Sequence, residues 1–375
     1  MLDQNYSLLV GTYSDLDALA HQPFAPTPGK GIYSMTLNRD GTLTEGSVVA
    51  ALNPAVLIPG PTTTSGPSVY AILETIQENG TVVRYSVHHG GTLVEQERWQ
   101  ASGKSTCYLA LAPAGDAAVV INYWDATIDV ASVANGVLGP VHQSFVQVKR
   151  PEGEWRQVEN REDHWGNRQV GPHAHCAHFW HDWVFIPDLG ENAIFQYRWD
   201  AAAKQLIHEL AIDFEAGSGP RHMAMHPDLD ICYVSNELFN TVCVARLDAS
   251  DPSAIKPRLV PFQYESTLEN RDQESYVSEI RLSPDARFLY VSNRGDNSLA
   301  IFAVGTDGSL SRQAVVPTGG KFPRHFSITP DGQAVIVANQ DSGHVRVFSR
   351  DVESGDIEMT EEIVEIPAPN YIRFL

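Results

Sequence analysis

Three short segments of the chain place a basic side chain immediately after a proline. They are Gly171-Pro-His-Ala-His175, Gly219-Pro-Arg-His222 and Phe322-Pro-Arg-His325, and they supply His173, Arg221 and Arg324. Imidazole groups transfer protons near neutral pH, and guanidinium groups bind carboxylates, phosphates and developing oxyanions. If the fold brings these segments together, they predict a site for acid–base chemistry on an anionic small molecule.

A second pattern recurs along the chain, in which a Pro-Asp turn leads into an apolar stretch that ends in Ser-Asn or Ala-Asn. Its copies run over residues 226–236, 283–293 and 329–339, with a looser copy over 112–122. Each copy is followed by a polar turn and a second stretch of alternating apolar and polar residues. This alternation, rich in Val, Ile, Phe and Tyr and bounded by Gly, Asp and Asn, is typical of half-buried β-strands, and no comparable segment has a helical period.

Another short strand precedes each of these turns. Such strands begin at Pro54, Ser105, Pro172, Pro220, Val277, Pro323 and Asn370. Seven units of four short antiparallel strands predict an all-β fold, a seven-bladed β-propeller. The strand at 370–375 has no partners after it, and the strand at 8–13 has no inner strand before it. We therefore expect the N- and C-terminal strands to pair and close the ring, in one domain over residues 1–375. A two-domain β-sandwich protein is the alternative.

In such a blade the start of the inner strand and the end of its neighbour lie on one face of the ring. The neighbouring strand ends supply Glu74, Asn122, Asp188, Glu237, Arg294 and Gln340. Together with the basic residues after the prolines, they would line one concave mouth of the central channel, the kind of place where pKa values are perturbed for catalysis. The alternative is that these charges form ion pairs that fill the channel and that the histidines are structural.

Composition argues against several classes of partner and cofactor. The formal net charge is −20, which disfavours nucleic acid and anionic membranes as partners. No basic segment followed by an apolar run opens the sequence and no stretch is long and apolar enough to span a membrane, so we expect a cytoplasmic protein. The four cysteines form no CxxC pair. His173, His175, His178 and His181 have no acidic partner at ligand spacing, so no metal is predicted. Phosphate-binding loops and nucleophile elbows are also missing, and no cofactor is expected.

Four segments resemble signature segments of the propeller lactonase family, which includes 6-phosphogluconolactonases and enzymes that interconvert carboxymuconate and its lactone. They are Gly171-Pro-His-Ala-His, Gly219-Pro-Arg-His, Val234-Ser-Asn-Glu and Val291-Ser-Asn-Arg, and the resemblance extends to Gly11-Thr-Tyr-Ser and Ile372-Arg-Phe-Leu. It implies a cofactor-free site of one His, two Arg and one Glu. These catalytic roles fall on His173, Arg221, Glu237 and Arg294. We expect Glu74, His175, His222, Arg324 and His325 to bind substrate.

The favoured hypothesis is a lactonase that hydrolyses an anionic sugar-acid lactone, with Glu237 or His173 as general base and Arg221 and Arg294 stabilising the oxyanion. One alternative is a cycloisomerase of the carboxymuconate lactonizing type that uses the same groups. Another is a non-catalytic interaction scaffold, although the Trp-Asp pairs at 124–125 and 199–200 do not recur in register. A polar insertion at about 146–170 could act as a lid, with Trp155, His164 and Trp165 available for contact, or could be a solvated loop.

Overall fold

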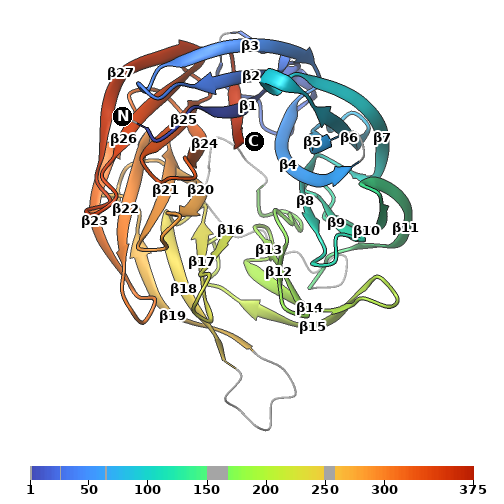
Figure 1. Cartoon of the computed structure of the whole chain (residues 1–375). Coiled ribbons are helices and arrows are strands. Elements are labelled where there is room, and N and C mark those ends of the chain that lie inside the picture. Colours follow the sequence, from blue (N-terminus) through green and yellow to red (C-terminus); the bar gives the residue numbers. More distant parts are fainter. Residues whose placement is uncertain (1, 26, 64–65, 150–167, 249–257) are drawn as a thin grey trace.

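The structure, a computed structural model, describes residues 2–25, 27–63, 66–149, 168–248 and 258–375. Seven four-stranded antiparallel sheets surround a common centre (Figure 1). Within the described residues the only helical elements are two 3-10 turns, η1 (Leu16–Ala18) and η2 (His89–Gly91). None of the helices in these ranges could cross a membrane. The predicted all-β, seven-bladed propeller is confirmed.

The first four blades, given from the innermost strand outwards, are as follows. They comprise β28 (Pro369–Phe374), β1 (Tyr6–Thr12), β2 (Gly31–Leu37) and β3 (Leu43–Ala50); β4 (Pro54–Thr63), β5 (Gly66–Leu73), β6 (Asn79–Val87) and β7 (Leu93–Lys104); β8 (Thr106–Leu111), β9 (Ala117–Asn122), β10 (Thr127–Ala134) and β11 (Val137–Val146); and β12 (His178–Trp180), β13 (Trp183–Asp188), β14 (Ala193–Asp200) and β15 (Gln205–Asp213).

The remaining three blades follow the same order. They comprise β16 (Pro220–Met225), β17 (Ile231–Asn236), β18 (Thr241–Asp248) and β19 (Arg258–Ser266); β20 (Tyr276–Leu282), β21 (Phe288–Arg294), β22 (Ser298–Val304) and β23 (Leu310–Pro317); and β24 (Pro323–Ile328), β25 (Ala334–Asn339), β26 (His344–Arg350) and β27 (Ile357–Glu365). Hereafter the face of the ring on which the innermost strands begin is the upper face, and the face on which they end is the lower face.

The ring closes where the two ends of the chain meet. Strand β28 pairs antiparallel with β1, from Leu8 opposite Phe374 to Gly11 opposite Tyr371. Figure 1 shows β28, in red, as the innermost strand of a blade whose other strands, β1 to β3, are blue. This pairing confirms the predicted closure. It also leaves no unpaired strand edge between the first and last blades.

The core lies between neighbouring blades. All residues of β9, β17 and β25 are buried, because both faces of these second strands are covered by the adjacent blades, as in other doubly covered sheets. The outermost strands instead alternate between exposed and partly buried residues, as in β3 and β27. One cluster, for example, joins Tyr233 and Val244 of one blade to Leu289 and Phe302 of the next. The blades are therefore held together mainly by apolar contact, with a few side-chain hydrogen bonds between neighbours, such as that from the Tyr233 hydroxyl to the backbone oxygen of Gly308.

The innermost strands β16 and β20 each contain a β-bulge near the upper face. Pro220 pairs with Asn236 and Met223 with Val234, so both Arg221 and His222 lie opposite Ser235. In the next blade Ser278 and Glu279 likewise lie opposite Ser292. A bulge redirects side chains that would otherwise point to opposite faces of the sheet. Two consecutive residues of each strand can therefore contribute to the centre of the ring.

The serine of the recurring Val-Ser-Asn string supports this bulge. The hydroxyl of Ser235 accepts a hydrogen bond from the backbone N–H of His222 at 3.1 Å, and that of Ser292 accepts one from the N–H of Glu279 at 3.0 Å. Because the bulge adds one residue to the strand, this N–H does not meet a carbonyl of the neighbouring strand. A buried N–H needs another acceptor, and the serine hydroxyl provides it. The repeat thus contains the residue that stabilises the bulge.

One blade differs from the prediction. Its innermost strand, β12, begins at His178 rather than at Pro172. The preceding residues follow β13 irregularly: Ala174 forms an isolated bridge with Asp188, and the Asp188 carboxylate accepts the N–H of His173 at 2.7 Å. Here the Asp188 carboxylate takes the place of a backbone carbonyl as acceptor, so the regular hydrogen bonds between two β-strands do not form. The insertion residues Trp155, His164 and Trp165 lie outside the described residues.

Replacing Ser292 or Ser235 with alanine should lower the free energy of unfolding by about 1–3 kcal/mol, because a buried N–H loses its acceptor. Urea denaturation would measure this effect. The Ser349→Ala variant is the control, since Ser349 is exposed and such changes usually alter stability by less than about 0.5 kcal/mol. If Ser292→Ala were as stable as this control, the assigned role of the serine would be wrong.

Candidate active site

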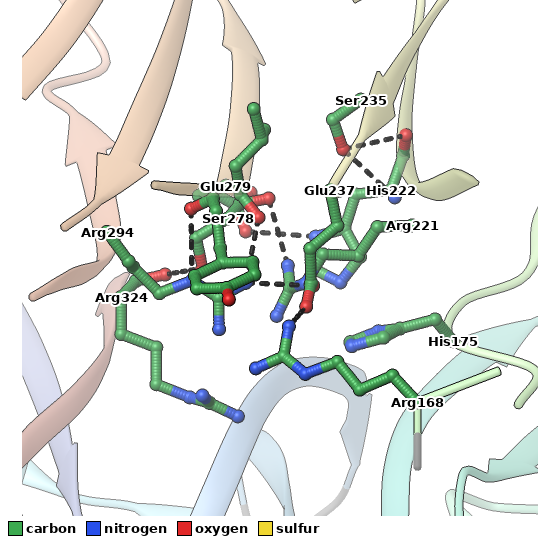
Figure 2. Close-up of polar contacts among 12 residues, drawn as sticks. Arg168, His175, Arg221, His222, Ser235, Glu237, Ser278, Glu279, Arg294 and Arg324 are labelled. Carbon is green, nitrogen blue, oxygen red and sulfur yellow. Dashed lines mark hydrogen bonds and ion pairs between the residues drawn. The ribbon is translucent and has the colours of Figure 1, made fainter. Parts of the chain in front are cut away.

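Three guanidinium groups contact the carboxylate of Glu237, which follows β17 at the upper face. Its Oε2 atom lies 2.8 Å from Nε of Arg221 and 2.8 Å from Nη2 of Arg294, and its Oε1 atom contacts Nη1 of Arg168. All four side chains are at most 5% exposed. Figure 2 shows the three arginines converging on this carboxylate from different elements. The predicted Arg221, Glu237 and Arg294 are therefore brought together.

Backbone carbonyl groups fix two of these arginines. Nη1 of Arg221 donates to the carbonyl oxygen of Ser278 at 2.9 Å. Nη2 of Arg294 donates to the carbonyl oxygen of Val277 at 2.8 Å, and its Nε to that of Tyr276 at 3.3 Å. A guanidinium that is already oriented loses little further side-chain entropy when it binds an anion.

Aromatic rings lie against two of the arginines at the upper face. The guanidinium of Arg168 lies 4.7 Å from the centre of the Tyr276 ring, and that of Arg324 lies 5.2 Å from the Tyr13 ring. Cation–π contacts of this kind stabilise a buried charge without neutralising it. In Figure 2 the side chains of Arg168 and Arg324 extend toward the same region from opposite sides.

The arginines affect one another's ionisation. Burial, together with the charge of Arg324, lowers the pKa of Arg294 to about 9. Burial and the charges of Arg294 and Arg324 also lower the pKa of Arg221 well below its usual value, and the charge of Glu279 opposes this effect. Since like charges cost more in a buried site, an anionic ligand would relieve this repulsion. The electrostatics of the site favour negatively charged small molecules.

The carboxylate of Glu74 lies next to Tyr13, on the Arg324 side of the cluster. It accepts hydrogen bonds from the Tyr13 hydroxyl at 3.1 Å and from Oγ of Ser105 at 2.6 Å. Although burial opposes ionisation of Arg324, the neighbouring Tyr13 and Glu74 raise its pKa above the usual value. Glu74 and Arg324 thus both lie at the upper face, as the strand-end argument predicts.

His173 is buried and is oriented by Tyr123. The two rings are stacked with their centroids 4.6 Å apart, and Nδ1 of His173 lies 3.0 Å from the backbone oxygen of Tyr123. A carbonyl oxygen can only accept a hydrogen bond, so Nδ1 must carry the proton. In that tautomer Nε2 has the lone pair, and the imidazole can accept a proton there.

His175 lies between the Tyr123 ring and His222. Its ring centroid is 5.3 Å from that of Tyr123 and 4.9 Å from that of His222. Burial and the charge of Arg221 lower the pKa of His175 well below the usual value. It is therefore a neutral imidazole at pH 7, and its Nδ1 atom has no hydrogen-bond partner among the described residues.

Two of the predicted substrate-binding residues lie elsewhere. His222 and His325 point toward Glu279: Nδ1 of His222 is 3.2 Å from Oε2 of Glu279, and Nε2 of His325 is 3.6 Å from the same atom. The bulge in β16, and a similar register shift between Pro323 and His325 in β24, direct them toward Glu279, although each follows an arginine of the upper site in sequence. Their predicted role beside Arg221 and Arg324 does not fit this geometry.

Other strand-end residues have structural contacts. The amide of Asn122 donates to the backbone oxygen of Thr127 at 2.9 Å, and that of Gln340 donates to Asp341 at 2.9 Å. Asp188 accepts the N–H groups of His173 and Glu191, and burial raises its pKa to about 7. Asp188 thereby positions the backbone of His173 rather than facing Glu237.

Sequence patterns did not identify several residues of this site. His21, which follows η1, lies 3.4 Å from the Tyr123 hydroxyl through Nε2. Burial and the charges of Arg168 and Arg324 lower its pKa to about 2, so it is neutral. Nothing in its local sequence indicates this position. Arg168 lies at the end of the polar insertion. Tyr123 directly follows the copy of the repeat at 112–122, and this position at a strand end could have identified it as a residue of the upper face.

A metal-binding arrangement of three or more His, Cys, Asp or Glu side chains does not occur within the described ranges. The four cysteines are free and buried. Burial raises the pKa of the Cys107 thiol well above its usual value, so this group is not a reactive thiolate.

Comparisons with known proteins agree with the fold. The family model described as "Lactonase, 7-bladed beta-propeller" matches residues 7–374. A 6-phosphogluconolactonase of Bacillus subtilis is 27% identical, with 92% of this chain and 95% of that protein covered, and one of Formosa agariphila is 28% identical, with 90% and 93% covered. The structure of a periplasmic gluconolactonase of Pseudomonas aeruginosa aligns with a TM-score of 0.83, 28% identity and 99% of both chains covered.

These matches show that the protein belongs to the class of lactonase-type propellers. Since the family model covers nearly the whole chain, the chain belongs to the family of seven-bladed β-propeller lactonases. The resemblance noted in the sequence is thereby confirmed.

The buried histidines predict how stability depends on pH. Burial lowers the pKa of His178 and of His222 to about 4, whereas an unfolded histidine has a pKa of about 6.5. The unfolded state therefore binds more protons between these values, and stability is lost as the pH falls. Between pH 7 and pH 5 the free energy of unfolding should fall by roughly 1–2 kcal/mol per imidazole.

Urea denaturation at both pH values would measure this loss. His178→Gln should reduce the loss of unfolding free energy between pH 7 and pH 5 by the contribution of one imidazole. His142→Gln, at an exposed position, should show the same loss as the unmodified protein. Equal pH dependence in these two variants would contradict the assignment.

Proposed function

We propose that this protein hydrolyses the lactone of a sugar acid, and that the substrate carries an anionic group. The observation that carries this proposal is the set of buried guanidiniums around Glu237, close to a histidine whose Nδ1 atom is held by a backbone carbonyl. The names of the relatives, 6-phosphogluconolactonase and gluconolactonase, support the same class of reaction.

In the proposed reaction His173 is the general base. Its Nε2 atom removes a proton from water as the water oxygen attacks the lactone carbonyl carbon, and the carbonyl oxygen becomes an oxyanion. As the tetrahedral intermediate collapses, the bond to the ring oxygen breaks, and His173 returns the proton to that oxygen. The product is an open-chain hydroxy acid. General-base catalysis of this type typically contributes about a hundredfold to ten-thousandfold in rate.

Arg221 and Arg294 would stabilise the oxyanion. Both are oriented by backbone carbonyls before substrate binds, and oriented charges in a buried site stabilise developing negative charge more effectively than water does. Glu237 is less suited to act as the base. Its two oxygens contact three guanidiniums, and protonating it would leave those charges uncompensated. We assign to Glu237 the role of holding the arginines in place.

Arg324 and Arg168 would bind the anionic group of the substrate. The guanidinium of Arg324 rests on the ring of Tyr13, and that of Arg168 rests on the ring of Tyr276 while it contacts Glu237. A phosphate or carboxylate offers the bidentate geometry that a guanidinium prefers. The proposed reaction uses only side chains of the protein, so dialysis against EDTA should leave the rate of lactone hydrolysis unchanged.

Replacing His173 with glutamine should lower kcat for lactone hydrolysis by at least about a hundredfold. The fold should remain intact, because the glutamine amide can still donate to the Tyr123 carbonyl. Titration of the acid released from aldonolactones, phosphorylated lactones and muconolactones at constant pH would measure the rates. Arg246→Gln is a matched control, since Arg246 is an exposed arginine beside Phe262.

Activity of His173→Gln within twofold of the unmodified protein would rule out the assigned base. Turnover of muconolactones alone would instead favour the cycloisomerase. If no lactone were consumed, the hydrolase proposal would be wrong.

Arg324→Gln should affect substrates according to their charge. For a phosphorylated lactone KM should rise about tenfold or more, the loss expected for one charge-assisted hydrogen bond. For the uncharged lactone of the same sugar KM should change little. An equal effect on both substrates would show that Arg324 does not bind the anionic group.

A further inference from the structure

A second polar cluster lies at the centre of the ring, below the candidate active site. Oε1 of Glu279 is 3.1 Å from Nε of Arg281, and its Oε2 atom is within reach of His222 and His325. Nη2 of Arg281 also lies 3.0 Å from Nε2 of His325. Figure 2 marks the contact between Glu279 and His222. None of these groups takes part in the reaction proposed above.

This cluster borders a cavity of about 370 Å³, within the range of ordinary small-molecule sites. The cavity is lined by the later residues of innermost strands, Met223 to Met225 of β16, Ile280 to Leu282 of β20 and Ser327 to Ile328 of β24. The upper site instead uses the first residues of the same strands. The cavity therefore lies toward the lower face, and none of the arginines that contact Glu237 belongs to its lining.

Most of the cavity wall is apolar. Its main apolar residues are Tyr108, Met223, Met225, Leu282, Ile328 and Tyr371. The ring of Tyr108 faces those of His178 and His222, with centroids 5.9 and 6.0 Å apart. Methionines adapt to ligands of different shape and pack well against rings. A flat apolar group fits such a wall better than a hydroxylated sugar does.

The charges at this cavity do not balance within the described residues. Glu279 is the carboxylate of the cluster, and burial keeps His222 and His325 neutral by lowering their pKa values. Arg281 is about one quarter exposed, so a molecule in the cavity can reach it. Arg373 follows Tyr371 by two residues in β28, which places both on the same face of the strand.

Arg373 forms no ion pair with a carboxylate among the described residues. Burial and the charge of Arg281 lower its pKa. Its Nε atom is buried and has no hydrogen-bond partner in the described part of the chain. Arg281 and Arg373 thus lie near each other at this end of the ring, and of the two only Arg281 contacts the carboxylate of Glu279.

From this geometry we propose that the lower cavity is a second binding site, specific for a small monocarboxylic acid with an apolar, ring-sized body. The carboxylate would pair with Arg281 and Arg373, and the body would pack between Tyr108, Tyr371 and the methionines. Burying an apolar group and neutralising the unbalanced charge both favour this class of ligand. The site is independent of the proposed lactonase activity.

Isothermal titration calorimetry with benzoate tests the proposal on the full chain. Benzoate should bind saturably with one molecule per chain, and at least tenfold more tightly than benzamide, which lacks the charge, or gluconate, which lacks the apolar body. Arg373→Gln should weaken benzoate binding about tenfold, the loss of one charge-assisted contact. Arg281→Gln should do the same if it folds. Because Arg281 supports Glu279, Arg373→Gln is the decisive variant.

Two further variants separate the lower cavity from the upper site. Arg324→Gln and Arg246→Gln should both bind benzoate like the unmodified protein. Loss of binding in Arg324→Gln with retention in Arg373→Gln would place benzoate at the upper site and overturn the proposal. Equal binding of benzamide or gluconate, or no saturable binding at millimolar benzoate, would overturn it as well.

Discussion

A buried guanidinium is stable only where a negative group or a set of fixed dipoles lies against it. The upper face of this propeller gathers four arginines at its centre, and the carboxylate of Glu237 contacts the three that are buried. Backbone carbonyls at the start of β20 provide further acceptors for two of them. The arrangement requires that strands from separate blades end within a few ångströms of one another, so the site depends on the closed ring.

Bulges in the innermost strands allow one short strand to serve two sites. Ser278 shows how closely the sites are connected. Its carbonyl oxygen accepts from Arg221, its hydroxyl donates to the backbone of Arg324 at 2.6 Å, and the next residue is Glu279 of the lower cluster. The two ends of the ring are separate in charge and in shape, but they share the backbone that positions them.

The repeat in the sequence was sufficient to predict the fold. Alternating strands, Pro-Asp turns and the two unmatched end strands gave the blade number and the closure, because these features are local and periodic. The same reasoning placed Arg221, Glu237, Arg294, Arg324 and Glu74 at one face. Strand polarity alone determines that placement.

Side-chain direction was harder to predict. His222 and His325 follow arginines of the upper site in sequence, yet they contact Glu279. The alternation of apolar and polar residues along a strand does not reveal where a bulge occurs. The serine of the Val-Ser-Asn string, which accepts a hydrogen bond at the bulge, looks in the sequence like an ordinary member of the repeat. His21 and Arg168 reach the site from segments without a periodic pattern, and only the folded ring brings them near Glu237.

Pairing of β28 with β1 has a consequence for protein synthesis. Tyr371, which lines the lower cavity, belongs to β28, and Tyr13, which supports Arg324, directly follows β1. While the ribosome is still translating residues 369–374, the inner edge of β1 has no partner, and its backbone N–H and C=O groups are available to other chains. Pairing with β28 therefore protects this edge of β1 from contact with other chains.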